Sequence, residues 1–247
     1  IIYIMMNDLF ILIMAGGLGK RMNSDIPKVL HLINNEPMII KIIKTANRLK
    51  PKKIIIVVGK FKEIIKNKIS EYINLTNIEF IDQDEPLGTG HAIMCCSKYL
   101  SNYLNSKTLI LSGDVPLITE NTLNKIINNS KNVTIATSKV DNPYGYGRIV
   151  LNNNIFEKIV EEKDCNDLEK DIKIINSGIY IFNTEILIKN INFINNINKQ
   201  NEYYLTDIFS IIKNKNINID LYNIESYNEI LGVNTSEQLN YLNKIII

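Results

Sequence analysis

The chain has 247 residues, of which 45% are hydrophobic and 22% are charged, and its net charge is +2. This size and composition favour one large folded domain with a substantial core. The lysines are scattered rather than clustered, and no apolar run reaches the roughly 18 residues of a membrane span, so we expect neither a nucleic-acid nor a membrane partner.

Strand-like and helix-like segments alternate through the first part of the chain. Strands are predicted over 10–15, 52–59, 78–83, 107–112 and 132–140, and helices over 37–49, 61–73, about 91–104 and from about Thr119. The segments 10–15 and 52–59 contain continuous apolar runs, which are typical of strands covered on both faces. The alternation therefore predicts an α/β fold with a Rossmann-like, doubly wound and mostly parallel sheet.

The regular alternation of strand-like and helix-like segments is less clear after about residue 140. Residues 145–162 resemble a hairpin whose turn is Asn152 to Asn154, 174–182 resemble a strand, and 235–245 a helix. We interpret this half as a small inserted β layer on the same sheet. The expected organisation is a single domain over 1–247, with an extension over 1–8, a core over about 9–233 and a C-terminal helix over about 235–247.

The cysteines and the first residues of the chain indicate the cellular compartment. The chain has three cysteines, Cys95, Cys96 and Cys165. Their number is odd and no two of them have the C-x-x-C spacing, which favours reduced thiols. The apolar start of the chain lacks a basic region and a cleavage site, so it is not predicted to be a signal peptide. A cytoplasmic protein is expected.

Four loops that follow predicted strands are rich in glycine and functional side chains: AGGLGKRM (15–22), QDEPLGTGHA (83–92), SGDVPL (112–117) and NPYGYGR (142–148). Ligands of doubly wound sheets bind beyond the carboxyl ends of the strands. The four loops are therefore expected to surround one site.

The first loop has the composition of a phosphate-binding turn. Gly16, Gly17 and Gly19 let backbone N–H groups approach phosphate oxygens. Arg21 could bind phosphate as a fork and Lys28 as a point charge. The loop matches neither the P-loop motif nor the dinucleotide motif, and a glycine turn with two solvated cations is the alternative.

Two further loops add candidate ligands. Asp114 ends an apolar run near the predicted phosphate loop and is suited to holding Mg²⁺, although a turn-initiating aspartate would look the same. Thr89 precedes a predicted helix and is expected to cap its N-terminus.

The chain resembles the sugar-nucleotide pyrophosphorylases, and within them the uridyltransferase half of the bacterial bifunctional N-acetylglucosamine-1-phosphate uridyltransferases. The matching stretches include MAGGLGKRMNSDIPKVLH, QDEPLGTGHA, GDVPLI, NPYGYGRIV, IVEEKD, INSGIYIF, NEYYLTDI and GVN. They run in order from about residue 9 to 240. The resemblance implies the nucleotide-diphospho-sugar transferase fold and Mg²⁺-dependent transfer of UMP from UTP to N-acetylglucosamine-1-phosphate.

The resemblance also implies roles for individual residues. The nucleotide-binding residues would be Met14, Ala15, Gly16, Gly17, Gln83, Gly88, Thr89 and Gly113, with Gln83 and the backbone of Gly88 and Thr89 reading uracil. Arg21 and Lys28 would neutralise the triphosphate, and Asp114 and Asn234 would ligate Mg²⁺. The sugar-binding residues would be Gly147, Glu161, Asn176, Tyr204 and Thr206, with Glu161 preferred over its neighbour Glu162.

The sequence departs from the family pattern in two places. Lys20 stands where the family usually has threonine or serine, and no hexapeptide repeat of a C-terminal β-helix acetyltransferase domain is present. We therefore expect uridyltransferase activity alone and make no prediction of the oligomeric state. A different sugar-1-phosphate or nucleotide, or a non-catalytic sugar-nucleotide-binding regulator, remain the alternatives.

Overall fold

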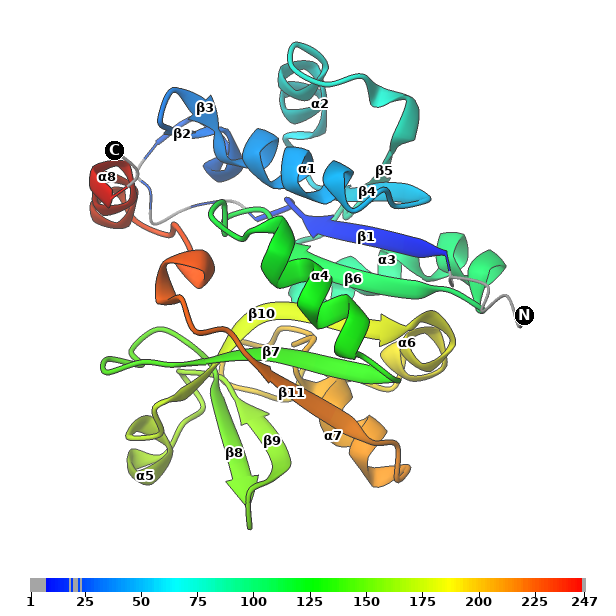
Figure 1. Ribbon diagram of the computed structural model, residues 1–247, viewed down its shortest axis with the longest axis vertical. Coiled ribbons are helices and arrows are strands. Elements are labelled where there is room, and N and C mark those ends of the chain that lie inside the picture. Colours follow the sequence, from blue (N-terminus) through cyan, green and yellow to red (C-terminus); the bar gives the residue numbers. More distant parts are fainter. Residues whose placement is uncertain (1–7, 18, 20–21, 23, 246–247) are drawn as a thin grey trace.

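A computed structural model describes residues 8–17, 19, 22 and 24–245, and Figure 1 shows its arrangement. The strands of the large sheet are β1 (Leu9–Met14), β4 (Lys53–Val58), β5 (Ile78–Asp82), β6 (Lys107–Ser112), β7 (Val133–Lys139), β8 (Arg148–Asn152), β9 (Ile155–Val160), β10 (Ile174–Asn183) and β11 (Ile219–Asn223). A small ribbon pairs β2 (Leu32–Ile33) with β3 (Glu36–Pro37). The α-helices are α1 (Met38–Arg48), α2 (Lys62–Ser70), α3 (Thr89–Leu100), α4 (Glu120–Asn129), α5 (Asp167–Lys170), α6 (Thr184–Ile191), α7 (Asp207–Asn214) and α8 (Ser236–Ile245).

The strand order explains how the loops are brought together. The main path is β11-β7-β10-β6-β1-β4-β5, and the β8–β9 hairpin is attached to β10. β1, β4, β5 and β6 are mutually parallel, whereas β10 runs antiparallel to both β6 and β7. The predicted mostly parallel sheet is confirmed. Because β10 is reversed, its first residues lie at the edge where the parallel strands end, which we call the carboxyl edge.

Strand β1 shows why the sheet is covered on both faces. Ile11 and Ile13 pack in one core cluster with side chains of α1 and α4, and Phe10 and Leu12 pack in a second with those of α3 and α7. Alternate residues of a strand point to opposite faces, so an unbroken apolar run needs helices on both sides. Figure 1 shows α1 and α4 in front of the sheet and α3 behind it.

The predicted hairpin after residue 145 is also confirmed. Its strands are β8 and β9, and the turn residues Asn153 and Asn154 have φ angles of 50° and 63°. A two-residue turn with positive φ at both positions matches the twist of the strands, and asparagine tolerates this conformation.

Helix α3 begins and ends earlier than the sequence indicates. It starts at Thr89 and stops at Leu100, where a 3-10 turn over Ser101–Tyr103 takes over. The expectation that Thr89 caps this helix is wrong, because Gly88 occupies the N-cap position with a φ of 115° and no side chain caps the helix.

The predicted C-terminal helix corresponds to α8, which lies beside the β2–β3 ribbon (Figure 1). Asn243 donates to the Leu32 carbonyl at 3.2 Å and accepts from the Asn34 N–H at 2.8 Å. Leu242 packs with Ile33 and Met38 in a third small core cluster. The end of the described chain is thereby fixed to the segment that follows the glycine-rich loop.

None of the helices in the described part of the chain is long and apolar enough to cross a membrane.

Candidate functional site

Backbone hydrogen bonds hold the first residues of three loops together at the carboxyl edge. Ala15 N–H donates to the Val57 carbonyl at 2.8 Å, and Gln83 N–H donates to the Val58 carbonyl at 2.7 Å. Gly113 N–H donates to the Met14 carbonyl at 2.9 Å. Residues that the resemblance assigns to the nucleotide therefore lie at neighbouring strand ends.

Two of the predicted nucleotide-binding glycines lie where these loops pack closely, and at Gly113 the close neighbour is a backbone atom. A Cβ atom on Gly16 would lie 2.8 Å from Gln83 Oε1, and one on Gly113 would lie 2.8 Å from the Met14 carbonyl oxygen. Gly17 is different, because no described residue other than its chain neighbours has an atom within 4 Å of such a Cβ. An open backbone beside packed loops can admit a phosphate.

Of the two cations predicted to bind the triphosphate, the structure describes Lys28. Arg21 lies outside the described residues, as does Lys20. Lys28 is the first residue of a short 3-10 helix, η2 (Lys28–Leu30), which follows the glycine-rich loop. Its ammonium group forms an ion pair with Asp114 and donates to Asn234 Oδ1 at 3.1 Å. The structure thus brings both predicted metal ligands to one predicted phosphate-binding lysine.

Asp114 is stabilised as a carboxylate despite its burial. Burial would raise the pKa of its carboxyl group, but the Lys28 ammonium and the Ser112 hydroxyl outweigh this and hold the pKa below its usual value. Ser112 Oγ donates to Asp114 Oδ1 at 2.6 Å, and Val233 N–H donates to the Asp114 carbonyl at 2.9 Å. Sequence analysis missed Ser112, although its place at the end of β6 beside Asp114 is the signal that could have found it.

Asp114 and Asn234 fit a magnesium ion by their donor chemistry. Both offer oxygen, the ligand type that Mg²⁺ prefers, and the Lys28 ammonium already bridges them as a cation. Within the described residues, no group of three or more His, Cys, Asp or Glu side chains could hold a metal ion. A single carboxylate suits a metal that is bound largely through substrate phosphates.

Gln83 is buried at the entrance to the second loop. Its Nε2 donates to the Gly88 carbonyl at 3.0 Å and lies 3.3 Å from His91 Nδ1. His91 Nδ1 also lies 3.0 Å from the Glu85 carbonyl, so the ring ties this loop to the first turn of α3. The Gln83 amide is therefore held against Gly88, its predicted partner in reading the base.

The predicted sugar-binding residues gather at the same edge, around the start of β10 and the end of β9. Thr206 Oγ1 donates to Glu161 Oε1 at 2.9 Å, and a Cβ on Gly147 would lie 3.4 Å from Glu161 Oε2. Asn176 N–H donates to the Gly147 carbonyl at 2.9 Å. Burial raises the pKa of Glu161, and the Thr206 hydroxyl opposes that shift.

Tyr204 belongs to this group through its position beside Thr206. Its hydroxyl accepts from Gln200 Nε2 at 2.7 Å, and burial raises its pKa to about 12. Asn176 Nδ2 donates to the Tyr180 hydroxyl at 2.7 Å, which fixes the amide at the bulged start of β10. The structure thus links Gly147, Glu161, Asn176 and Thr206 by direct contacts and places Tyr204 two residues before Thr206.

A buried arginine that sequence analysis missed connects the two loops of this group. Arg148 is 1% exposed, and its guanidinium donates to the Tyr146 carbonyl and, at 2.8 Å, to Glu162 Oε2. The same Glu162 oxygen accepts from the Gly145 N–H at 2.8 Å. Glu162 is therefore engaged in holding the loop, which supports the preference for Glu161 as the residue that contacts a ligand.

Replacing Glu162 with alanine is expected to destabilise the fold, because it leaves the buried Arg148 charge without its carboxylate partner. Loss of one partner of a buried pair costs about 3–5 kcal/mol, and because the Glu162 side chain is 24% exposed we expect about 2–3 kcal/mol. Urea unfolding measures this difference. Asp167→Ala is the matched control, since Asp167 also pairs with a cation but is 99% exposed. Equal stabilities of the two variants would contradict the assigned role of Glu162.

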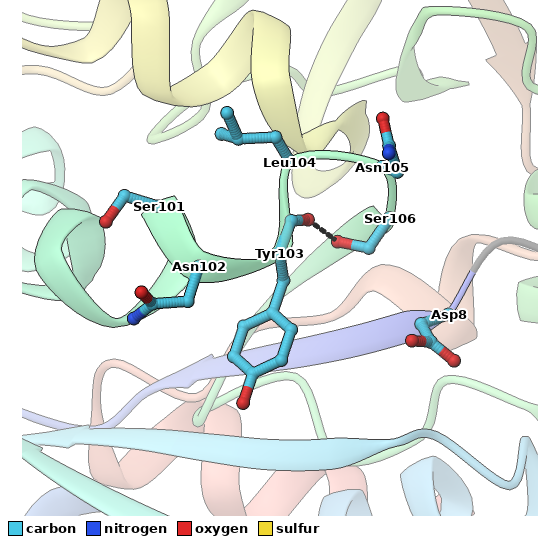
Figure 2. Close-up of a pocket in the computed structure, with 7 residues that line it drawn as sticks. All are labelled: Asp8, Ser101, Asn102, Tyr103, Leu104, Asn105 and Ser106. Atoms are coloured by element: carbon cyan, nitrogen blue, oxygen red, sulfur yellow. Dashed lines mark hydrogen bonds between the residues drawn. The ribbon is translucent and has the colours of Figure 1, made fainter.

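A separate cavity of ≈ 370 Å³ lies at the opposite edge of the sheet, and Figure 2 shows the residues that line it. Asp8 precedes β1 and Ser106 precedes β6, so this cavity lies at the amino ends of strands whose carboxyl ends carry the candidate site. The Ser106 hydroxyl donates to the Tyr103 carbonyl at 2.6 Å. The cavity is thus distinct from the candidate site.

Comparison with known proteins identifies relatives along the whole chain. A protein of Acanthamoeba polyphaga mimivirus named a probable UDP-N-acetylglucosamine pyrophosphorylase is 44% identical, over 97% of this chain and 96% of the relative. The bifunctional protein GlmU of Streptococcus gordonii is 41% identical over 91% of this chain. The chain spans about half the length of that streptococcal relative, 49%.

Solved structures show the fold, and a family match extends along most of the sequence. A crystal structure of UDP-glucose pyrophosphorylase complexed with UDP-glucose superimposes with a TM-score of 0.77 at 18% identity, over 97% of this chain and 98% of the other. The protein therefore has the nucleotide-diphospho-sugar transferase fold. Residues 11–227 match the family described as nucleotidyl transferase. With its glycine-lined carboxyl edge and its Lys28, Asp114 and Asn234 cluster, this chain belongs to the nucleotidyl transferase family.

Proposed function

We propose that the protein transfers UMP from UTP to N-acetylglucosamine-1-phosphate in a Mg²⁺-dependent reaction, giving UDP-N-acetylglucosamine and pyrophosphate. The observation that carries the proposal is the Lys28, Asp114 and Asn234 cluster beside the open backbone of the glycine-rich loop. The mimiviral relative, which this chain covers almost completely, is named for a pyrophosphorylase of the same product. That relative supports the choice of sugar and base.

The reaction needs positioning and charge compensation more than a covalent nucleophile. A phosphate oxygen of the sugar-1-phosphate attacks the α-phosphorus of UTP, a new phosphorus–oxygen bond forms, and the bond to the β-phosphate oxygen breaks to release pyrophosphate. The backbone of Gly16 and Gly17 would line the triphosphate, while Lys28 and Arg21 would compensate its charge. Mg²⁺ held by Asp114 and Asn234 would further neutralise the triphosphate when it is bound.

The second substrate would be oriented by the residues around β9 and β10. The Glu161 carboxylate can accept a hydrogen bond from a sugar hydroxyl, and Asn176 offers an amide next to it. Tyr204 and Thr206 lie on the adjoining segment and would contact the acetamido group. The sugar would then be held on the same edge as the nucleotide, with its phosphate directed toward the α-phosphorus.

The test is pyrophosphate release in the presence of Mg²⁺, with each of UTP, dTTP, GTP and ATP paired with a panel of sugar-1-phosphates. We expect the highest kcat/KM for UTP with N-acetylglucosamine-1-phosphate. Preference for another sugar or nucleotide would keep the reaction class but refute the proposed substrates. No release with any pair would favour a sugar-nucleotide-binding regulator.

A further inference from the structure

The base-reading loop is joined to the sugar-binding segment by direct hydrogen bonds. Tyr203 N–H donates to the Leu87 carbonyl at 2.8 Å, and Gly90 N–H donates to the Tyr203 carbonyl at 2.7 Å. The third bond uses a side chain, since Leu205 N–H donates to Thr89 Oγ1 at 3.0 Å. Residues 87–90 and 203–205 are thus paired along their length, although 116 positions separate Thr89 from Leu205.

The two glycines on either side of Thr89 are required by this pairing. A Cβ on Gly88 would lie 2.6 Å from the Tyr203 carbonyl oxygen, and Gly88 also has a φ of +115°. A Cβ on Gly90 would lie 2.2 Å from Ile194 Cδ1 and 2.9 Å from the same carbonyl oxygen. The glycines in the G-T-G sequence therefore permit contact with residues 203–205, and Thr89 supplies the only side chain between them.

The paired segment continues directly into the predicted sugar site. Tyr204 and Thr206 flank Leu205, and the Thr206 hydroxyl donates to the Glu161 carboxylate at 2.9 Å. Helix α7 begins at the next residue, Asp207, so the segment is anchored at its far end. A shift of Leu205 would therefore move Tyr204, Thr206 and the hydrogen bond that orients Glu161.

We propose that Thr89 is a positioning residue whose hydroxyl couples binding of the nucleotide base to binding of the sugar. This inference rests on the proposed function and deepens it, because it connects the two substrate subsites through one side chain. The base would bind against the backbone of Gly88 and Thr89, and the Thr89 hydroxyl would transmit that fixed position to Leu205. The coupling is the free energy by which binding at one subsite changes binding at the other, and here both subsites would act on the segment around Leu205.

The hydroxyl matters because the Leu205 N–H has little access to water. Leu205 is buried, and a buried donor left without a partner is unfavourable. Valine has nearly the shape of threonine but cannot accept a hydrogen bond, so Thr89→Val removes the coupling group with little change in volume. Serine keeps the hydroxyl, and Thr89→Ser should restore the contact.

The experiment measures binding of UDP and of UDP-N-acetylglucosamine by calorimetry, since UDP occupies the base subsite alone and the product occupies both subsites. For Thr89→Val we expect UDP affinity to fall less than twofold and UDP-N-acetylglucosamine affinity to fall at least tenfold. Thr89→Ser should remain within twofold of the parent protein for both ligands. Thr119→Val is the matched control, because the Thr119 hydroxyl caps α4 and accepts from the Thr122 N–H at 3.2 Å.

The outcomes separate this inference from the proposed function. An equal loss of affinity for both ligands in Thr89→Val, or a lower melting temperature with both affinities retained, would overturn the coupling role. Ligand binding by the parent protein tests the proposed function. A parent that binds UDP but favours another UDP-sugar would refute the proposed sugar, and the same variants measured with that UDP-sugar would still decide the role of Thr89.

Discussion

Lys28→Ala is expected to lower kcat/KM for pyrophosphate release at least tenfold. Lys28 is the described cation that contacts both predicted metal ligands, Asp114 and Asn234. Its removal takes a positive charge away from the predicted triphosphate and leaves the buried Asp114 carboxylate without its ion-pair partner. Loss of one preorganised electrostatic group typically costs about 10²–10³ in rate, so a decrease near a hundredfold would match a direct role.

Steady-state kinetics with varied UTP measure this effect, and circular dichroism checks that the fold is retained. Lys189→Ala is the matched control, because Lys189 also pairs with a carboxylate, Glu185 at 2.6 Å, but on the exposed surface of α6. That variant should keep the activity of the parent. A near-normal rate for Lys28→Ala would refute the assignment of Lys28 to the triphosphate.

Asp114→Asn is expected to lower turnover at least tenfold and to raise the Mg²⁺ concentration required for half-maximal activity. Asparagine keeps an oxygen that can accept from the Ser112 hydroxyl, so the local geometry should be retained. It removes the negative charge that the metal and the Lys28 ammonium would share. Because a metal held by one carboxylate depends strongly on that charge, the metal requirement should change along with the rate.

A magnesium titration at saturating UTP measures this change for Asp114→Asn. Asp167→Asn, which alters a carboxylate that is 99% exposed on α5, should leave both the rate and the titration unchanged. If Asp114→Asn lowers turnover without a change in the magnesium titration, Asp114 acts by positioning Lys28 and the metal assignment is wrong.

Much of the fold could be predicted because its strands are long apolar runs. The runs that form β1, β4 and β6 are buried on both faces, and only a sheet between two layers of helices accommodates them. Strand direction is not encoded in such a run, so the reversal of β10 could not be read from periodicity. Helices α6 and α7 and strand β11 lie among asparagine-rich stretches in which the apolar pattern is interrupted, and they were not predicted.

The candidate site could be located but not assembled from sequence alone. The glycine-rich loops indicated an edge of the sheet, yet Lys28 and Asn234 are 206 positions apart, and no spacing argument places them in contact. The resemblance assigned Lys28 to the triphosphate and Asn234 to the metal, and the structure shows the contact between them. Thr89 is a residue for which the sequence indicated the wrong partner. Its position before the predicted helix suggested that it caps the helix, but Gly88 is the N-cap, and the Thr89 hydroxyl accepts from the Leu205 N–H instead.

The attachment of α8 to the β2–β3 ribbon has a consequence for synthesis of the chain. Nascent chains emerge from the ribosome beginning at the N-terminus, so β1, β4, β5 and β6 are available for pairing long before Asn234 and Asn243 are made. The contacts of Asn234 with Lys28, and of Asn243 with Leu32 and Asn34, form only after residues 234–243 have been synthesised. A ligand stabilises only a state that binds it, so the proposed metal–triphosphate site, which includes Asn234, would add stability only after residue 234 has reached Lys28.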